Sequence, residues 1–326
     1  MKILSLFDWI SCWQQAITNL WITDYTYYSS EIDKYAIQVT QHNFPNTIQI
    51  WDVKSIQFEK CNYFWCNSSW DRVYEGWYNY CKYLWYNYCK GCWRPIIQAN
   101  IDLLLWWSPC QWFSFAWKQL NFEDERSKLF FEYVRILKEV KPKYFLLENV
   151  RMKKEYQDII SEHLFWIQPT TINSSLLTAQ NRVRLYWVWE LQEDWTYKQV
   201  EIEQPEDRGI LLKDILEDEV DEKYYLDTKQ YKWLKDFWSK SSFWWKINRD
   251  KANCLLASYW KVSWNWWKIK DNKWIRMFTP IECERLQWVR DWYTAWVSNS
   301  QRYKMLGNWW TVPVIEHILK HLNLNK

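Results

Sequence analysis

A cysteine follows the apolar segment 101–105 (IDLLL) on a short loop formed by Ser108, Pro109, Cys110 and Gln111. A thiol in such a place acts as a nucleophile when a neighbouring group lowers its pKa or takes its proton. The same pattern also fits a metal ligand or a small buried side chain, and for an isolated cysteine burial is the more common outcome. The interpretation of Cys110 therefore depends on the polar residues elsewhere in the chain.

Three polar groups follow Cys110 in the sequence and favour a catalytic role for it. Glu148 ends the next apolar segment, at residues 144–147. Arg182 and Arg184 belong to QNRVR, where strand alternation places both side chains on one face. A Gly-Asn pair at residues 307–308 precedes TVP near the C-terminus. These three features come in the same order as the strands and loops that carry them, which favours one shared site. Taken singly, the arginines also fit an exposed strand face.

Strand and helix patterns alternate along the first half of the chain, which predicts an α/β fold with a parallel sheet covered on both faces. Ligands bind such sheets beyond the carboxyl ends of the strands. Glu31, Asp52, Cys110 and Glu148 each follow an apolar segment, so we expect them along one rim; helix caps are the alternative for Glu31 and Asp52. The sequence predicts strands at 2–7, 25–30, 48–53, 101–105 and 144–147, and helices at about 14–20, 34–42, 128–140 and 312–322.

The pattern changes in two segments, and these divide the chain. Residues 190–275 are polar, irregular and rich in Lys and Trp, which predicts a second, smaller domain. We therefore expect a catalytic domain at 1–189 and a final segment at 276–326 whose last helix packs back on it. The other exception is an insert at 60–95 in which YNYCK occurs twice.

Five cysteines lie in this insert, and a C-x-x-C pair beside other cysteines is typical of zinc sites. The remaining spacings are irregular. Both a structural zinc and free cysteines in a variable loop stay open, and we favour the free cysteines. The candidate zinc ligands are Cys61, Cys66, Cys89 and Cys92. Outside the insert, Cys254 and Cys283 are predicted to be core residues.

Composition limits the class of protein. The formal net charge is +3, which permits nucleic-acid binding without arguing for it. The N-terminal apolar run is too short for a signal peptide, no segment reaches the roughly 18 apolar residues of a membrane helix, and the nine cysteines are scattered. A cytoplasmic protein that does not enter a membrane is expected.

In this order, the segments resemble the DNA cytosine-5 methyltransferase family along most of the chain, with the short bacterial and phage relatives of the animal de novo enzymes as the nearest group. LSLFD resembles the first cofactor motif, SPCQ the Pro-Cys motif, ENV the catalytic Glu motif and QNRVR the Gln-x-Arg-x-Arg motif. RMFTPIECERLQ (276–287) resembles the segment that seats the recognition domain, and YKMLGNWWTVPVIEHI the closing motif. The resemblance implies a Rossmann-like S-adenosylmethionine-dependent methyltransferase sheet, with 190–275 as the target-recognition domain.

The resemblance also implies roles for individual residues. Cys110 would add to cytosine C6, Glu148 would protonate or hydrogen-bond N3, Arg184 would bind O2, and Arg182 would support the loop or a phosphate. The base would flip out of double-stranded DNA, as in the DNA methylation of restriction-modification systems. The catalytic set includes Pro109, and the cofactor set is Phe7, Asp8, Glu31, Ile32, Asp52, Val53, Ser108, Leu129 and Asn308. An RNA cytosine-5 methyltransferase and a catalytically inactive DNA-binding member are the alternatives.

Tryptophan stands where the family has glycine. The chain has 31 Trp and 4 Gly, whereas about 7% glycine is usual. Trp9 follows LFD, and its indole would project into or beside the methionine pocket. Trp187 and Trp310 fall where relatives carry a true Trp. The codon UGA is read as Trp in some genetic codes and as Gly in others, so translation with the wrong code is one explanation. A chain with these tryptophans is expected to fold poorly and bind cofactor weakly. The other apparent glycine positions are Trp51, Trp106, Trp107, Trp112, Trp117, Trp288 and Trp309.

Overall fold

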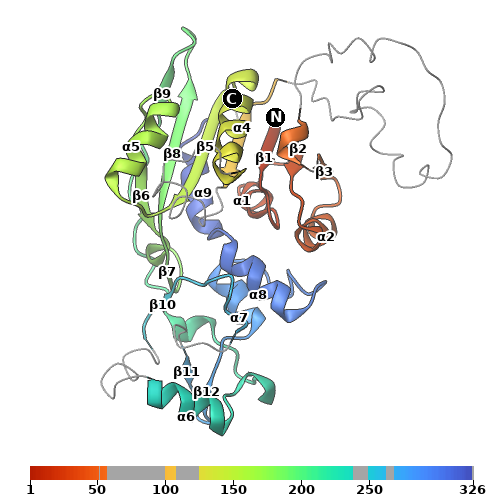
Figure 1. The fold of residues 1–326 in the computed structure, drawn as a ribbon, viewed down its shortest axis with the longest axis vertical. Coiled ribbons are helices and arrows are strands. Elements are labelled where there is room, and N and C mark those ends of the chain that lie inside the picture. Colours follow the sequence, from red (N-terminus) through yellow and green to blue (C-terminus); the bar gives the residue numbers. More distant parts are fainter. Residues whose placement is uncertain (51, 57–99, 108–124, 238–248, 262–267, 325–326) are drawn as a thin grey trace, which may run out of the picture.

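A single large sheet dominates the computed structural model, which describes residues 1–50, 52–56, 100–107, 125–237, 249–261 and 268–324. The loop with Ser108, Pro109 and Cys110, and the four candidate zinc ligands, lie outside these residues. The sheet has eight strands in the order β3-β2-β1-β4-β5-β8-β6, with β9 beside β8 (Figure 1). Its strands are β1 Lys2–Leu6, β2 Thr26–Ser30, β3 Ile48–Gln49, β4 Leu103–Trp107, β5 Tyr144–Val150, β6 Thr170–Asn173, β8 Val183–Leu191 and β9 Tyr197–Gln199.

The first five strands are parallel, as the alternating pattern predicts, and β8 runs antiparallel to β5. The chain builds outward from β1 to β3, then returns to the other side of β1 with β4. The carboxyl ends of β1 and β4 therefore flank the point where the strand order reverses. In open α/β sheets this is where a ligand crevice forms.

Helices cover both faces of the sheet, and each face has its own apolar core. On β1, Ile3 belongs to one core and Leu4 to the other, as strand alternation requires. The first core includes α1 and α9, and the second includes α4 and α5. The helix predicted at the C-terminus thus packs back on the sheet domain, against α1. These helices are α1 Cys12–Asn19, α2 Lys34–Asn43, α4 Glu125–Val140, α5 Lys154–His163 and α9 Val312–Lys320.

The first two predicted strands are each one residue too long, and the limits of the third, fourth and fifth are wrong by two residues or more. The third strand stops at Gln49, because Asp52 accepts a hydrogen bond from the Lys54 N–H and caps a 3-10 helix, Val53–Ser55. The fourth strand begins two residues late and continues to Trp107, since a neighbouring strand on each side extends its hydrogen bonding. The fifth continues through Glu148 to Val150, paired with β8.

The second half of the chain forms a smaller body joined to the sheet. In Figure 1, α6, β11 and β12 lie at the end of the molecule far from the sheet, and α7 and α8 lie between. The domain limits at 189 and 275 stay a prediction, although β8 and β9 carry the main sheet to Gln199. The elements between the sheet and the far end of the molecule, and at that end, are β7 Gln180–Asn181, paired with β10 Ala252–Asn253, 3-10 helices Leu212–Ile215 and Glu222–Tyr224, α6 Thr228–Phe237, β11 Ile269–Lys270, β12 Ile275–Arg276, α7 Pro280–Leu286 and α8 Asn299–Asn308. No helix in the described part of the chain is long and apolar enough to span a bilayer.

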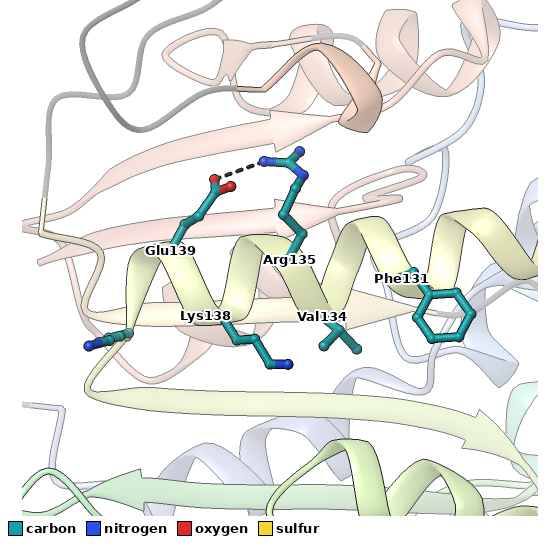
Figure 2. Close-up of a pocket in the computed structure, with 6 residues that line it drawn as sticks. Phe131, Val134, Arg135, Lys138 and Glu139 are labelled. Carbon is teal, nitrogen blue, oxygen red and sulfur yellow. Dashed lines mark hydrogen bonds and ion pairs between the residues drawn. The ribbon is translucent and has the colours of Figure 1, made fainter.

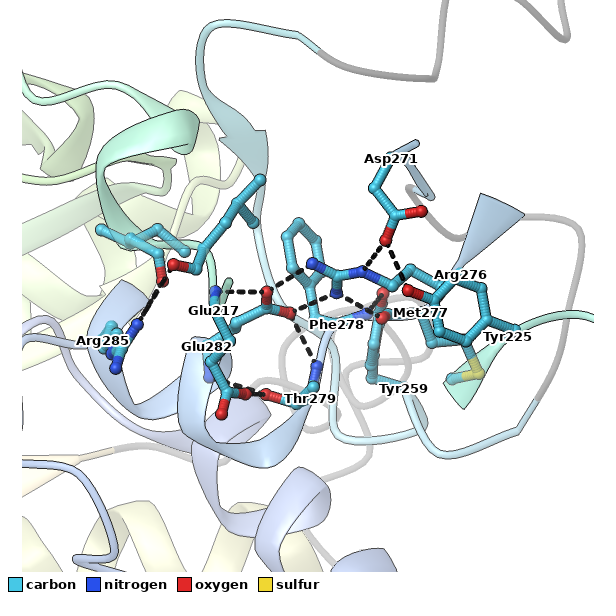
Figure 3. Close-up of polar contacts among 12 residues, drawn as sticks. Glu217, Tyr225, Tyr259, Asp271, Arg276, Met277, Phe278, Thr279, Glu282 and Arg285 are labelled. Atoms are coloured by element: carbon cyan, nitrogen blue, oxygen red, sulfur yellow. Dashed lines mark hydrogen bonds and ion pairs between the residues drawn. The ribbon is translucent and has the colours of Figure 1, made fainter. Parts of the chain in front are cut away.

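Buried ion pairs join α7 to the smaller body (Figure 3). The Arg276 guanidinium donates two 2.8 Å hydrogen bonds to the Glu282 carboxylate, and its Nε lies 2.9 Å from Asp271. Glu282 also accepts from the backbone N–H groups of Thr279 and Glu217. Arg276 and Glu282 are almost completely buried. The 276–287 segment therefore fixes the smaller body through a fully hydrogen-bonded charge network.

The backbone of this protein is unusual at its tryptophans. Among the residues that the structure describes, ten other than glycine have a positive φ, and six of these are tryptophan. A left-handed conformation costs a residue with a Cβ roughly 1–2 kcal/mol, a cost that glycine avoids. The six are Trp9, Trp21, Trp166, Trp195, Trp288 and Trp292.

Candidate active site

Glu148 is buried at the carboxyl half of β5, opposite Tyr186 of β8. Its Oε1 lies 2.9 Å from Nε of Arg184, which comes from the neighbouring strand. Apart from this ion pair, neither carboxylate oxygen has a hydrogen-bond partner among the described residues. A buried carboxyl with free acceptor capacity is costly to leave unused, so it points to a ligand at this place.

The surroundings of Glu148 favour its protonated form. Burial raises the pKa of Glu148 to about 7, and the opposing attraction of Arg184 and Arg182 reduces this rise without cancelling it. A carboxyl group with this pKa is protonated in a large fraction of molecules at neutral pH. It can donate a proton to a ring nitrogen and take it back, which is the behaviour of a general acid.

Cys254 lies between the two arginines of the QNRVR segment. Its Sγ is 3.1 Å from a terminal guanidinium nitrogen of Arg182 and 3.5 Å from one of Arg184. Burial acts to raise the pKa of this thiol, but the two guanidinium groups outweigh that effect and lower it below its usual value. The prediction of a core cysteine is wrong here, because the side chain is only half-buried and faces charges. Nothing in the local sequence distinguishes it; only the β7–β10 pairing brings it to the arginines.

Arg182 holds three chain segments together. It donates to the carbonyl oxygens of Leu255 and Gly307 at 3.3 and 3.2 Å, in addition to its contact with Cys254. Its neighbour Gln180 accepts from the Leu255 N–H at 2.9 Å. The segment that supplies Arg184 beside Glu148 therefore also anchors the smaller body and the end of α8. The role expected for Arg182, support of the loop or of a phosphate, stays a prediction, because the Cys110 loop lies outside the described residues.

At the other side of the rim, Glu31 shapes the loop after β1. One carboxylate oxygen accepts from the N–H groups of Ile32 and Asp33, both at 2.8 Å, and the other accepts from Trp9 at 2.9 Å. Burial raises the pKa of Glu31 despite these bonds. A carboxylate has about four acceptor positions, so one remains for a ligand hydroxyl.

Asp8 is buried, and its carboxylate is hydrogen-bonded to other residues of the protein. It accepts hydrogen bonds from Tyr27 Oη at 2.6 Å and from the Ser11 hydroxyl, and burial raises its pKa. It therefore fixes the shape of the loop after β1, next to Phe7, whose φ is positive.

The other predicted cofactor residues, apart from Ser108 outside the described residues, lie in several elements. Asp52 is exposed at the end of the β3 segment, and Val53 is buried. Ile32 is 70% exposed, and an exposed apolar side chain beside Glu31 is a surface that a flat ring would cover. Leu129 packs partly against the second core from α4, and Asn308 is the last residue of α8.

Trp9 stands at the crevice where the strand order reverses. Its indole packs edge-on against Trp107 at the end of β4, with ring centroids 5.4 Å apart. On another side Nζ of Lys304, from α8, lies 5.6 Å from the ring centroid. The backbone carbonyl of Trp9 accepts a hydrogen bond from Thr40. The Trp9 ring thus lies against the carboxyl end of β4, beside the point where the strand order reverses.

A separate depression of about 670 Å³ lies on α4 (Figure 2). Arg135 crosses it, paired with Glu139 at 2.8 Å. None of the predicted site residues lines it, and its only acid, Glu139, is paired with Arg135. We assign it no role. Its lining residues are Phe131, Val134, Arg135, Lys138, Glu139 and Lys141.

Known proteins resemble this chain in sequence and in fold. Residues 93–323 match the family model for C-5 cytosine-specific DNA methylases. The chain belongs to the C-5 cytosine-specific DNA methylase family. It is 33% identical over 244 residues to the type II methyltransferase M1.ScrFI of Lactococcus lactis subsp. cremoris, covering 68% of this chain and 62% of that protein. It is 30% identical to M.HpaII of Haemophilus parainfluenzae over 258 residues, covering 68% and 72%.

Solved structures confirm the fold expected of this family. A methyltransferase from Entamoeba histolytica superimposes with a TM-score of 0.69 at 16% identity, covering 99% of this chain and 97% of that one. Spodoptera frugiperda DNMT2, as a mutant, gives a TM-score of 0.67 at 22% identity, covering 98% and 99%. The Rossmann-like methyltransferase sheet predicted from the sequence is therefore confirmed.

Proposed function

We propose that this protein transfers a methyl group from S-adenosylmethionine to C5 of a cytosine in double-stranded DNA. The observation that carries the proposal is the buried Glu148–Arg184 pair at the carboxyl edge of the sheet. Glu148 has unused oxygens and a pKa raised to about 7, and Arg184 is held beside it. One acid and one guanidinium group match N3 and O2, the two neighbouring acceptors on the cytosine ring.

The proposed chemistry begins with the thiol of Cys110. Cytosine C5 is a poor nucleophile until another nucleophile adds at C6, so Cys110 forms a bond to C6 as its proton leaves. Protonated Glu148 donates to N3 and prevents negative charge from building on the ring, while Arg184 binds O2. S-adenosylmethionine, when bound, supplies the methyl group to the activated C5. Loss of the C5 proton to a base and elimination of Cys110 then restore the ring, and N3 returns its proton to Glu148.

Glu31 and Asp52 would hold the nucleoside part of the cofactor at the ends of β2 and β3. The target base must leave the helix stack to reach a carboxyl that is buried in the sheet edge. The smaller body at 190–275 would contact the DNA around it, with its lysines on the phosphates.

Methyl transfer from radiolabelled S-adenosylmethionine tests the proposal. Duplex DNA should become labelled at cytosine C5, whereas tRNA should not. Label in tRNA alone would favour the RNA cytosine-5 methyltransferase instead.

Substitution of the nucleophile separates an enzyme from an inactive DNA-binding member. Cys110→Ser should abolish transfer and leave DNA binding largely intact. Cys283→Ala is the matched control, because it removes a thiol that makes no contact with Glu148 or Arg184. Unchanged transfer in Cys110→Ser would reject the covalent mechanism.

A further inference from the structure

Several tryptophans occupy helix ends that are built for glycine. After α1, Trp21 has a φ of 60°, its N–H donates to Thr18 O, and the Ile22 N–H donates to Ile17 O. This is the hydrogen-bond pattern of a Schellman motif, in which the left-handed residue is usually glycine. The indole of Trp21 is 88% exposed, so the side chain gains no packing that would offset the backbone conformation.

The same motif ends α7. Trp288 has a φ of 65°, its N–H donates to Arg285 O at 3.0 Å, and the Val289 N–H donates to Glu284 O at 3.1 Å. After α5, Trp166 has a φ of 62°, and its N–H donates to Ser161 O. Three separate helices therefore place tryptophan in the left-handed turn that follows them.

The hairpin between β8 and β9 repeats the pattern. Trp195 donates to Gln192 O, and Gln192 donates to Thr196 O, with a φ of 64° at Trp195. A turn followed by one left-handed residue is a common three-residue hairpin, and glycine is favoured at that last position. Trp195 is 71% exposed. A glycine that the chain does carry, Gly209, has a φ of 67°.

The buried tryptophans differ in whether the indole N–H has a hydrogen-bond acceptor. Trp106, Trp189 and Trp309 bury an Nε1–H that has no acceptor among the described residues. Trp187 is equally buried, but its Nε1–H donates to Ser161 Oγ at 3.0 Å. Buried polar groups are nearly always hydrogen-bonded, so the first group lacks the signature of residues selected as tryptophan.

We propose that the natural protein has glycine at both sets of positions, because its source reads UGA as glycine. Trp187 remains a true tryptophan, because its buried Nε1–H is hydrogen-bonded. One codon reassignment accounts for the six left-handed tryptophans and the three unpaired indoles together, whereas Phe7, Ser11, Lys141 and Phe165 have a positive φ that it does not explain. The glycine positions are 9, 21, 106, 166, 189, 195, 288, 292 and 309.

One of the proposed glycine positions, residue 9, belongs to the candidate active site, where its backbone N–H donates to Glu31. Glycine there keeps the backbone N–H that donates to Glu31, while removing the ring that packs against Trp107 in the crevice. The loop after β1 would then leave the crevice open to a ligand. The inference does not depend on the methyltransferase activity, because residue identity and thermal stability test it.

Mass spectrometry of the protein purified from its source gives the direct test. Peptides spanning positions 9, 195 and 288 should contain glycine. Tryptophan in these native peptides would overturn the proposal.

Variants of the chain as written give a second test. Trp21→Gly and Trp195→Gly should each raise Tm by about 2 °C, since the left-handed cost is removed and these exposed indoles lose little packing. Trp187→Gly is the matched control and should lower Tm by several degrees, because its ring is buried and hydrogen-bonded. A fall in Tm for Trp21→Gly and Trp195→Gly as large as the control's would contradict the proposal.

Discussion

The stability of this protein should depend on pH through Glu148, and Glu148→Gln should remove that dependence. The folded protein raises the pKa of Glu148 from 4.5 to about 7. Between these values the folded state binds this proton and the unfolded state releases it. The stabilisation is therefore complete below pH 4.5 and is lost as pH rises through about 7.

The magnitude follows from the shift. Each pKa unit corresponds to about 1.4 kcal/mol, so a shift of two to three units gives about 3 kcal/mol. Glu148 is buried beside Arg184, so solvent screening does not reduce this value greatly. Gln keeps the size and the acceptor oxygen but has no proton to exchange. The difference in unfolding free energy between the native chain and Glu148→Gln should fall by about 3 kcal/mol from pH 4.5 to pH 7.5.

Urea denaturation followed by circular dichroism, at several pH values, measures this difference. Glu155→Gln is the control, because it removes the same charge from an exposed position on α5. Its unfolding free energy should run parallel to that of the native chain. Parallel curves for Glu148→Gln as well would refute the account of a buried, proton-retaining carboxyl.

Three other substitutions, each with a control variant, test the packing around Gly307, the ion pairs of Arg276 and the loop at Trp9. Gly307→Ala should destabilise the chain by about 1–3 kcal/mol, because a Cβ would lie 2.3 Å from the Leu256 carbonyl carbon; Gly209→Ala, with no atom within 4 Å, should cost only about 1 kcal/mol from its left-handed backbone. Equal effects in urea denaturation would contradict this. Arg276→Met should cost about 3–5 kcal/mol, since Glu282 is left buried and unpaired, while Lys223→Met, in an exposed pair, should leave the denaturation midpoint unchanged. A small effect at Arg276 would show that the network of Figure 3 does not hold the smaller body. Trp9→Gly should tighten S-adenosylmethionine binding at least about tenfold by calorimetry, because the indole leaves the crevice; Trp166→Gly, remote from it, should not, and equal affinities would reject the blocked crevice.

Periodicity predicts the five parallel strands of the sheet, because they are buried, and the amphipathic helices that cover them, but not the antiparallel strands β6, β8 and β9. The ends of strands were less predictable, since pairing with β8 extends β5 through Glu148 and a capping aspartate shortens β3. The place of Cys254 could not be predicted, because the β7–β10 pairing that brings it to Arg182 links residues far apart in the sequence. The glycine-like tryptophans were only partly predicted. Trp288 followed from family motifs, but Trp21 and Trp195 needed backbone angles.

The most direct test of the account is to trap the thiol on the base. DNA containing 5-fluorocytosine cannot lose a proton from C5 after methyl transfer, so the enzyme should remain covalently attached. Peptide mass spectrometry of the denaturant-resistant complex should place the base on Cys110. Attachment to Cys254, the thiol between Arg182 and Arg184, or methyl transfer to cytosine with no covalent complex, would contradict the assignment of Cys110 as the nucleophile.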